Sequence, residues 1–244
     1  MSRIALVTGA TRGLGLEIAR QLAQSGTTVF MSGREANRAE RAAQTMRGDG
    51  LDVFGVQLDV TNPASVRRVA EQIRSEHGVL DVLINNAGIL PEATSEAREV
   101  VDGGLFRETF DTNLLGVVNV TEQFLPLLRE SNAGRIVNIS TTMGSLNDQS
   151  DPQSPYFGMV VPAYQASKAA LNSVTISLAK SLADTIIKVN AVCPGFVQTD
   201  LTPINRQQAP LTAAEAARVA VRYALIDDEG PSGGFFDREA VVAW

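Results

Sequence analysis

Two side chains in the second half of the sequence could together move a proton. Tyr164 and Lys168 stand four residues apart in AYQASKAALNSV, so a helix here would place both on one face. A free phenol, with a pKa of about 10, does not exchange protons readily at neutral pH, but an ammonium within ~4–6 Å favours the phenolate. We therefore expect Lys168 to lower the pKa of Tyr164 and to make the phenol a general acid or base. The alternative is a surface pair of the kind that is common at this spacing.

Ser140 adds a hydrogen-bond donor to this pair. It ends a predicted strand and directly precedes the long segment that leads to Tyr164, so its hydroxyl could donate to a carbonyl oxygen. A serine at the end of a strand is by itself usually a helix cap or a turn former. Beside the Tyr-Lys pair, it favours the catalytic interpretation over the surface one.

The beginning of the chain carries a pattern that suits phosphate. The first apolar run leads into TGATRGLG at residues 8–15, which continues directly into a helical pattern. Glycines there let the backbone turn tightly and approach a pyrophosphate, which the free N–H groups and the dipole of the helix N-terminus attract. The spacing is GxxxGxG rather than the usual GxGxxG, and a glycine-rich turn without a ligand is the alternative.

Two strand ends further along could complete a dinucleotide site. Asp59, in the motif LDV, could accept a hydrogen bond from an adenine amino group. It could equally cap the helix that begins near Pro63 or stabilise the turn. The motif Asn85-Asn86-Ala87-Gly88 ends the fourth predicted strand, where small residues let a flat ring approach the backbone, although such residues are also ordinary in turns.

Strands and helices that position these residues alternate along the chain. Most of the β-branched runs are apolar nearly throughout, which is typical of strands covered on both faces, and helical spacing separates them. This alternation predicts βαβ units with a parallel sheet, and no linker divides residues 1–244 into separate domains. We expect strands at 4–8, 28–32, 53–58, 80–85, 135–140 and 187–192, and helices at 14–26, 35–47, 63–76, about 104–130, 163–183 and 213–225.

Two longer segments break this alternation. Residues 141–162 contain three prolines and no sustained period, and residues 196–211 follow the last long strand in the same way. We expect both to be long loops. Loops at the carboxyl ends of parallel strands are where such sheets bind ligands.

Composition restricts the class of protein. The 244 residues are 44% hydrophobic and 20% charged, enough for a substantial core, and a net charge of −6 without a basic run argues against nucleic acid. The apolar runs are strand-sized and no export leader is visible, so we expect no membrane span and a cytoplasmic location. The single Cys193 cannot form an internal disulfide and should be a buried, inert strand residue, and the single His77 leaves no zinc cluster, so we expect no metal.

Taken together, the motifs resemble the short-chain dehydrogenase/reductase family. They are TGATRGLG, LDV, NNAG, Asn113 within DTNLLG, IVNIS, YQASK and CPGFVQT, in the family's order, and they extend from residue 4 to about residue 201. The C-terminal EGPSGGFFDREAVVAW looks like the tail of the carbonyl-reductase-like branch. The resemblance implies a Rossmann-type doubly wound parallel sheet of about seven strands with helices on both faces.

The resemblance also implies a role for each member of an Asn-Ser-Tyr-Lys tetrad. Tyr164 would be the acid in carbonyl reduction and the base in alcohol oxidation, while Ser140 would polarise the substrate carbonyl. Lys168 would lower the pKa of Tyr164 and bind the nicotinamide ribose, and Asn113 would hold a water that links Lys168 to solvent. The implied cofactor contacts are Gly9, Thr11, Arg12, Gly13, Leu14, Arg34, Asp59, Val60, Asn86, Ala87, Gly88, Tyr164, Lys168, Pro194, Gly195, Val197 and Thr199, the last to the carboxamide.

The residues after the second strand indicate which nicotinamide cofactor is bound. An NAD enzyme keeps a carboxylate there for the adenosine ribose, whereas this chain has Ser32-Gly33-Arg34. Arg34 offers a fork of donors suited to a 2′-phosphate, and Arg12 would approach the same phosphate from the other side. We therefore predict NADP(H). The alternative is a solvated Arg34 with Glu35 on the ribose.

The segment before Tyr164 gives the expectations for substrate and assembly. The 23 residues between Ser140 and Tyr164 exceed the family's usual spacing, so we interpret 141–162 as an insertion at the rim of the substrate site. Its apolar content favours an uncharged, fairly apolar ketone or aldehyde, and its acidic residues argue against an acidic carrier protein. An insertion here could also cover the family's pairing surface, which favours a monomer over a homo-oligomer. The substrate contacts we expect are Met143, Phe157, Phe196 and Leu201.

The predicted function is NADPH-dependent reduction of a small-molecule ketone or aldehyde by hydride transfer, with Tyr164 as the general acid. Three alternatives stay open on the sequence. They are a carrier-linked 3-oxoacyl reductase, an alcohol dehydrogenase that works oxidatively with NAD, and a non-catalytic NADPH-binding sensor on the same fold.

Overall fold

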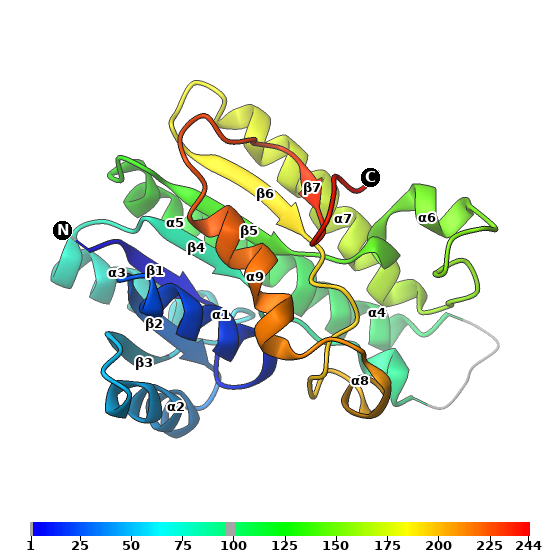
Figure 1. The fold of residues 1–244 in the computed structure, drawn as a ribbon, viewed down its shortest axis with the longest axis horizontal. Helices are drawn as coiled ribbons and strands as arrows, with labels where there is room; N and C mark the ends of the chain where they lie inside the picture. Colours follow the sequence, from blue (N-terminus) through cyan, green and yellow to red (C-terminus); the bar gives the residue numbers. More distant parts are fainter. Residues whose placement is uncertain (1, 96–100) are drawn as a thin grey trace.

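One parallel β-sheet organises the chain in this computed structural model (Figure 1). The structure describes residues 2–95 and 101–244, and within these ranges seven strands pair in the order β3-β2-β1-β4-β5-β6-β7, each parallel to its neighbours. The order reverses between β1 and β4, which opens a crevice at the carboxyl ends of these strands. The strands are β1 (Ile4–Val7), β2 (Thr28–Gly33), β3 (Val53–Gln57), β4 (Val82–Asn85), β5 (Arg135–Ile139), β6 (Lys188–Val192) and β7 (Phe235–Phe236).

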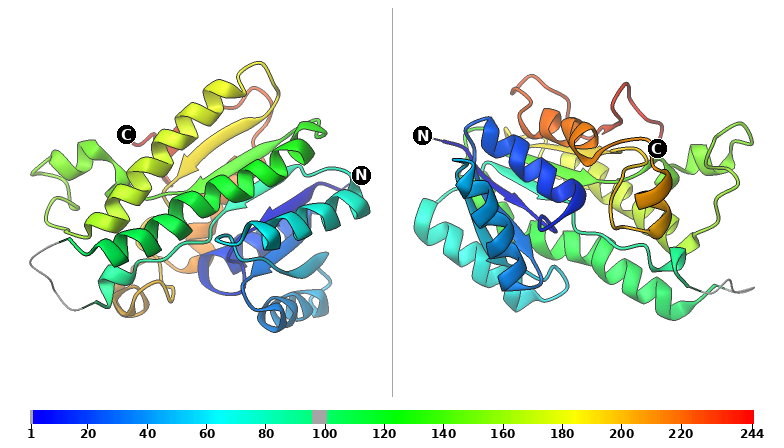
Figure 2. Two further views of the ribbon diagram at one scale, coloured as in Figure 1. Left: turned by 180° about the vertical axis from the view of Figure 1, so that it is seen from behind. Right: turned by 60° about the horizontal axis from the view of Figure 1, so that its bottom comes forward.

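Helices cover both faces of the sheet (Figures 1 and 2). Buried side chains of α1, α2 and α9 form the core on one face. Those of α3 and α5, with partly buried side chains of α7, form the core on the other. Strand β1 contributes Ala5 and Val7 to the first core and Ile4 and Leu6 to the second, as the alternation of side chains along a strand requires. The helices are α1 (Gly13–Gln24), α2 (Ala36–Gly48), α3 (Pro63–His77), α4 (Gly103–Phe110), α5 (Gly116–Arg129), α6 (Leu146–Ser150), α7 (Pro162–Ser181), α8 (Pro203–Gln208) and α9 (Ala213–Ala224).

Local signals at the helix ends explain where these helices begin and stop. In α3, the Asn62 side chain accepts hydrogen bonds from the amides of Ala64 (3.0 Å) and Ser65 (3.2 Å), and Pro63 occupies the first helical position. The helix ends at Gly78, whose φ of 72° favours glycine. The doubly wound fold is confirmed, and the six strands expected from the sequence agree with the structure to within two residues at each end.

Three expectations about local structure were wrong. The first is the regularity of the long helix expected at about 104–130: the chain is helical from Gly103 to Arg129 as expected, but a π-helical turn at Asp111–Leu115 lies inside the helix. The supposed loop 141–162 contains a 3-10 turn at Thr142–Gly144 and the helix α6, and the supposed loop 196–211 contains α8. Both short helices begin at a hydroxyl cap, Ser145 and Thr202, so local capping starts them where no hydrophobic period is present.

Close packing of α2 against β3 gives a stability prediction. A methyl group on Gly55 would lie 2.5 Å from the carbonyl oxygen of Ala39 and 2.6 Å from the amide nitrogen of Glu40. We expect Gly55→Ala to lower the free energy of unfolding by about 1–3 kcal/mol, because α2 must move off the sheet. Chemical denaturation measures this change. Gly48→Ala is the control, since a methyl group at Gly48 meets nothing within 4 Å; an equal loss in both variants would contradict the explanation.

Candidate active site

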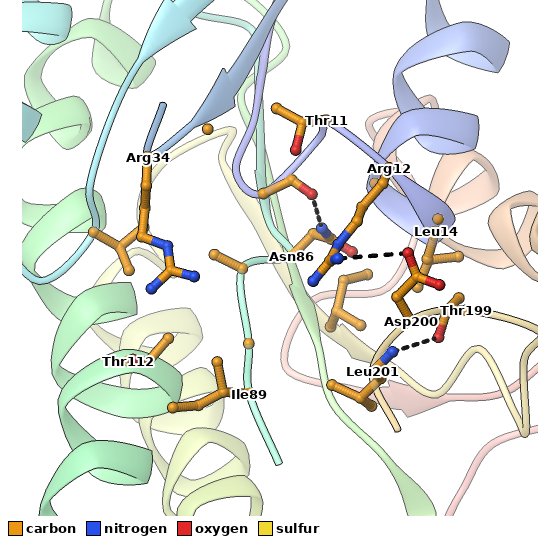
Figure 3. Close-up of a pocket in the computed structure, with 18 of the residues that line it drawn as sticks. Thr11, Arg12, Leu14, Arg34, Asn86, Ile89, Thr112, Thr199, Asp200 and Leu201 are labelled. Carbon is orange, nitrogen blue, oxygen red and sulfur yellow. Dashed lines mark hydrogen bonds and ion pairs between the residues drawn. The ribbon is translucent and has the colours of Figure 1, made fainter. Parts of the chain in front are cut away.

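A cavity of about 540 Å³ opens at the carboxyl ends of the strands (Figure 3). Every cofactor residue predicted from the sequence lines it, and so do Ser140 and Leu201. The structure thus brings together residues that are up to 190 positions apart, from Gly9 to Thr199. Asn113, which is fully buried, is not among the lining residues.

The glycine-rich turn forms the phosphate end of this cavity. Gly9 and Gly13 have φ values of 64° and 56°, which L side chains rarely adopt. A methyl group on Gly15 would lie 2.4 Å from Nδ2 of Asn86, so α1 can begin here only with glycine at that position. No side chain caps the start of α1 and no acidic residue stands in its first turn, which leaves its amides for an anion.

Strand β4 is tied to the glycine-rich turn by hydrogen bonds. The hydroxyl of Thr8 accepts from the amides of Asn86 (2.9 Å) and Ala87 (3.0 Å). In return, Nδ2 of Asn86 donates to the carbonyl oxygens of Thr8 (2.8 Å) and Gly9 (3.1 Å). Asn86 therefore shapes the turn through its side chain, a role that the sequence did not reveal.

Residues on the adenosine side explain the missing acid after β2. A methyl group on Gly33 would lie 2.4 Å from Cγ2 of Thr11, so a carboxylate at this position would have to displace the Thr11 side chain. The side chain of Thr11 thus fills the space beside Gly33. The carboxylate of Asp59 accepts from the amide (3.0 Å) and the hydroxyl (2.8 Å) of Thr61, so it stabilises its own turn, while Asn62 caps α3.

Arg12 and Arg34 line the same cavity without meeting. Figure 3 places Arg34 on the opposite side from Arg12, whose Nη1 lies 3.4 Å from Oδ2 of Asp200. Asp200 also pairs with Arg206, whose hydrogen bond holds the pKa of the Asp200 carboxyl below its usual value. Arg12 and Arg34 thus lie on opposite sides of the cavity, and their joint contact with a 2′-phosphate stays a prediction.

Arg38 is a third arginine of this region, which the sequence reasoning missed. It lines the same cavity and lies in the first turn of α2, four residues after Arg34 in the chain. Its Nε pairs with Oε2 of Glu35 at 3.1 Å. Glu35 is the residue just before α2 rather than a member of its first turn, and its carboxylate is shared with Arg38.

The π-helical turn between α4 and α5 positions Asn113. The side-chain oxygen of Asn113 accepts from the amide of Ile89, and its nitrogen donates to the carbonyl oxygen of Ile89, both at 2.9 Å. A π-helical turn inside a helix often marks a functional site. Here it turns a fully buried amide toward the segment that follows β4.

Asn113 and Lys168 approach each other on either side of Gly88. A methyl group on Gly88 would lie 3.4 Å from Oδ1 of Asn113 and 3.8 Å from Nζ of Lys168. Nζ also donates to the carbonyl oxygen of Ile139 (2.7 Å) and lies 5.8 Å from the centre of the Tyr164 ring. The π-helical turn, β4, β5 and α7 thus meet at one end of the cavity.

Burial governs the proton affinities at this end. It raises the pKa of Tyr164 above that of a free phenol, and the electrostatic influence of the nearby Cys193 adds to the rise. It lowers the pKa of Lys168 to about 8, opposed by Cys193. Burial therefore decides the net direction of the Tyr164 shift in this structure, and the expectation that Lys168 lowers the pKa of Tyr164 stays a prediction. Tyr164 is consequently protonated at neutral pH, as a general acid must be.

Ser140 has a partner that the sequence reasoning did not find. Its hydroxyl donates to Oδ1 of Asn172 at 2.6 Å, and both side chains are buried. Asn172 lies on α7 four residues after Lys168, so it shares a face with it. Nδ2 of Asn172 makes no hydrogen bond to the described part of the chain. A turn of the Asn172 amide would let Nδ2 donate to Ser140 and free the serine hydroxyl.

The predicted substrate contacts divide into two groups. Leu201 lines the cavity, whereas Met143, Phe157 and Phe196 are not among its lining residues. Phe157 is 50% exposed and Phe196 is 39% exposed. Cys193 is buried as expected, one residue beyond β6.

Comparison with known proteins identifies the class to which this site belongs. The sequence profile of short chain dehydrogenases matches residues 3–210. A (+)-neomenthol dehydrogenase of Arabidopsis thaliana is 35% identical, over 98% of this chain and 97% of the relative. The chain belongs to the short-chain dehydrogenase/reductase family, which uses nicotinamide cofactors. It is an oxidoreductase that acts on alcohols or ketones.

Two solved structures agree with the whole fold. Salutaridine reductase from Papaver somniferum superposes with a TM-score of 0.81 at 30% identity, covering 97% of this chain and 99% of that one. An NADPH-bound carbonyl reductase from chicken fatty liver superposes with a TM-score of 0.86 at 27% identity, covering 100% of this chain and 99% of that one.

No helix within residues 2–95 and 101–244 is long and apolar enough to cross a membrane.

The pKa of Lys168 predicts a pH dependence. Lys168 is charged below its pKa of about 8 and neutral above it, and in the predicted role its charge would stabilise the phenolate that forms when Tyr164 gives up its proton. We expect kcat/KM for carbonyl reduction to fall as pH rises through about 8, by up to about tenfold per unit. Initial rates at saturating cofactor between about pH 6 and 10 measure this decrease, which is the alkaline limb of the pH profile.

Two variants test the assignment to Lys168. Lys168→Met should be slow at every pH and lose the alkaline limb. Lys180→Met should keep it, because Lys180 is an exposed lysine near the other end of the same helix. An identical alkaline limb in Lys168→Met would assign the titration to another group.

Proposed function

We propose that this chain reduces a ketone or aldehyde to an alcohol with NADPH. The observation that carries the proposal is the juxtaposition of Ser140, Tyr164 and Lys168 at one end of a cavity whose other end holds arginines. Residues 1–244 act as one NADP-binding domain with 141–162 at the substrate rim, and the proposal retains the predicted cytoplasmic monomer. The relatives named reductases and dehydrogenases support the general reaction.

The cofactor would lie along the cavity with its phosphates at the start of α1. The glycine-rich turn and the uncapped amides there would hold the pyrophosphate. Arg34 and Arg38 would bind the 2′-phosphate, joined by Arg12 after it leaves Asp200. When bound, NADPH supplies the hydride. Its nicotinamide end would lie near Thr199 and Lys168.

Protein side chains would handle the proton. Tyr164 would donate its proton to the carbonyl oxygen, while the Lys168 ammonium stabilises the phenolate. Ser140 would donate to the same oxygen once the Asn172 amide turns to donate to it. Asn113, beside Lys168 at Gly88, would hold the water that returns the proton.

A carrier-linked 3-oxoacyl reductase is the second candidate. A ketoacyl reductase of the granaticin polyketide synthase of Streptomyces violaceoruber is 38% identical over 81% of this chain. The net charge of −6 and the aspartates at the rim, Asp148 and Asp151, disfavour an acidic carrier. Assay of a 3-oxoacyl thioester beside simple ketones separates the two candidates.

Removal of the Tyr164 hydroxyl tests the acid. We expect Tyr164→Phe to lower kcat for NADPH-dependent reduction by about 10²–10⁴-fold, because the substrate oxygen loses its proton donor. The readout is NADPH oxidation across a panel of ketones and aldehydes. Tyr223→Phe is the control, since Tyr223 stacks on Phe236 at 4.3 Å, outside the cavity. Activity that survives Tyr164→Phe would exclude the mechanism.

Charge reversal at Arg34 tests the cofactor. We expect wild-type protein to prefer NADPH to NADH, and Arg34→Asp to lower kcat/KM for NADPH by about 10- to 100-fold through loss of a charge-assisted contact. Values of kcat/KM with both cofactors provide the measurement. Arg67→Asp makes the same charge change on the exposed face of α3, away from the cavity. Equal use of NADH by wild-type protein, or an equal effect of both variants, would refute the NADP assignment.

A further inference from the structure

Glu92 lies outside the tetrad but contacts the backbone of Tyr164. It belongs to a short 3-10 turn, Pro91–Ala93, that follows β4. Its Oε1 accepts from the amide of Ala163 at 2.9 Å, and its Oε2 accepts from the amide of Tyr164 at 2.8 Å. A carboxylate more than 70 residues away in sequence therefore holds the first turn of α7, the helix that carries Tyr164 and Lys168.

The start of α7 depends on this carboxylate because its own residues supply no cap. The residue before the helix, Val161, offers no side-chain acceptor, and Pro162 has no amide hydrogen. The amide of Gln165 already donates to the carbonyl oxygen of Val161 at 2.9 Å. Ala163 and Tyr164 are thus the amides of the first turn that need an acceptor from elsewhere. Glu92 satisfies both, and its charge suits the positive end of the 20-residue helix.

The same segment is tied to a second tetrad member. Ile89, three residues before Glu92, exchanges two hydrogen bonds with the Asn113 side chain. Residues 89–92 therefore connect Asn113 at one end with the backbone of Tyr164 at the other. A shift of this segment would move both groups relative to Gly88, where the nicotinamide end of the cavity lies.

We infer that Glu92 is a positioning residue for Tyr164. It fixes the backbone from which the phenol projects and so sets the distance between the hydroxyl and the substrate oxygen. This inference rests on the proposed acid role of Tyr164. A misplacement of about 1 Å can cost on the order of 10²-fold in rate, so a cap remote from the chemistry can control it.

The test compares Glu92→Ala with Asn62→Ala in the full-length protein. Asn62 also caps a helix by accepting from two backbone amides, but on α3 and outside the cavity. Both variants should lower the midpoint of thermal unfolding by about 2–4 °C. Only Glu92→Ala should lower kcat, by about 10- to 100-fold, with KM for NADPH within about twofold of wild type.

Partial rescue by the amide sharpens this test. Glu92→Gln keeps one carbonyl oxygen for one of the two amides, so its kcat should fall between wild type and Glu92→Ala. Wild-type kcat in Glu92→Ala, or an equal loss of kcat in Asn62→Ala, would overturn the positioning role. A variant in which only KM for NADPH rises would also overturn the positioning role, because Glu92 would then act on cofactor binding.

Amide hydrogen exchange separates this inference from the proposed function. The amides of Ala163 and Tyr164 have no acceptor within α7, so their protection depends on Glu92. Their exchange should be faster in Glu92→Ala and unchanged in Asn62→Ala, whatever the substrate. If the wild-type protein reduced no carbonyl, the proposed function would be refuted, but the exchange of these two amides would still test the cap. Unchanged exchange in Glu92→Ala would refute the cap itself.

Discussion

The hydroxyl of Thr8 accepts hydrogen bonds from the amides of Asn86 and Ala87, and this contact joins the ends of β1 and β4 at the point where the strand order reverses. Both ends of the cavity depend on it. On one side it holds the glycine-rich turn against β4, where a methyl group on Gly9 would lie 3.0 Å from Cα of Ala87. On the other side, the chain beyond Ala87 continues to the residues that contact the tetrad. A change in the distance between these two strands would therefore alter the phosphate end and the chemical end together.

Burial is the second constraint on the site. Both Tyr164 and Lys168 lie in the interior, and desolvation shifts each pKa toward the neutral form of its side chain. The phenol is therefore a weaker acid than a free phenol. Because Lys168 titrates at about pH 8, the site can exchange protons near physiological pH while Tyr164 remains a phenol. The ammonium of Lys168 donates a hydrogen bond to the carbonyl oxygen of Ile139.

Much of the architecture was predictable because local forces decide it. Apolar, β-branched runs give buried parallel strands, and their ends were correct to within two residues. Hydrophobic periodicity could not predict the π-helical turn at Asn113 or the short helices α6 and α8, because capping and packing produce them. The sequence also did not predict the ion pairs between distant segments. Arg12 meets Asp200, 188 residues further on, and no local pattern indicates such a contact.

The sequence alone determined the inventory of the site: the glycines, the tyrosine and lysine at helical spacing, and the arginine where an acid usually stands. These follow from residue type and from spacing along one strand or helix. Tertiary structure decided which groups act on one another. It placed Glu92 on the amide of Tyr164 and Asn172 on Ser140, and it turned the pKa of Tyr164 upward. Such effects depend on burial and on contacts between distant segments, which chain order does not encode.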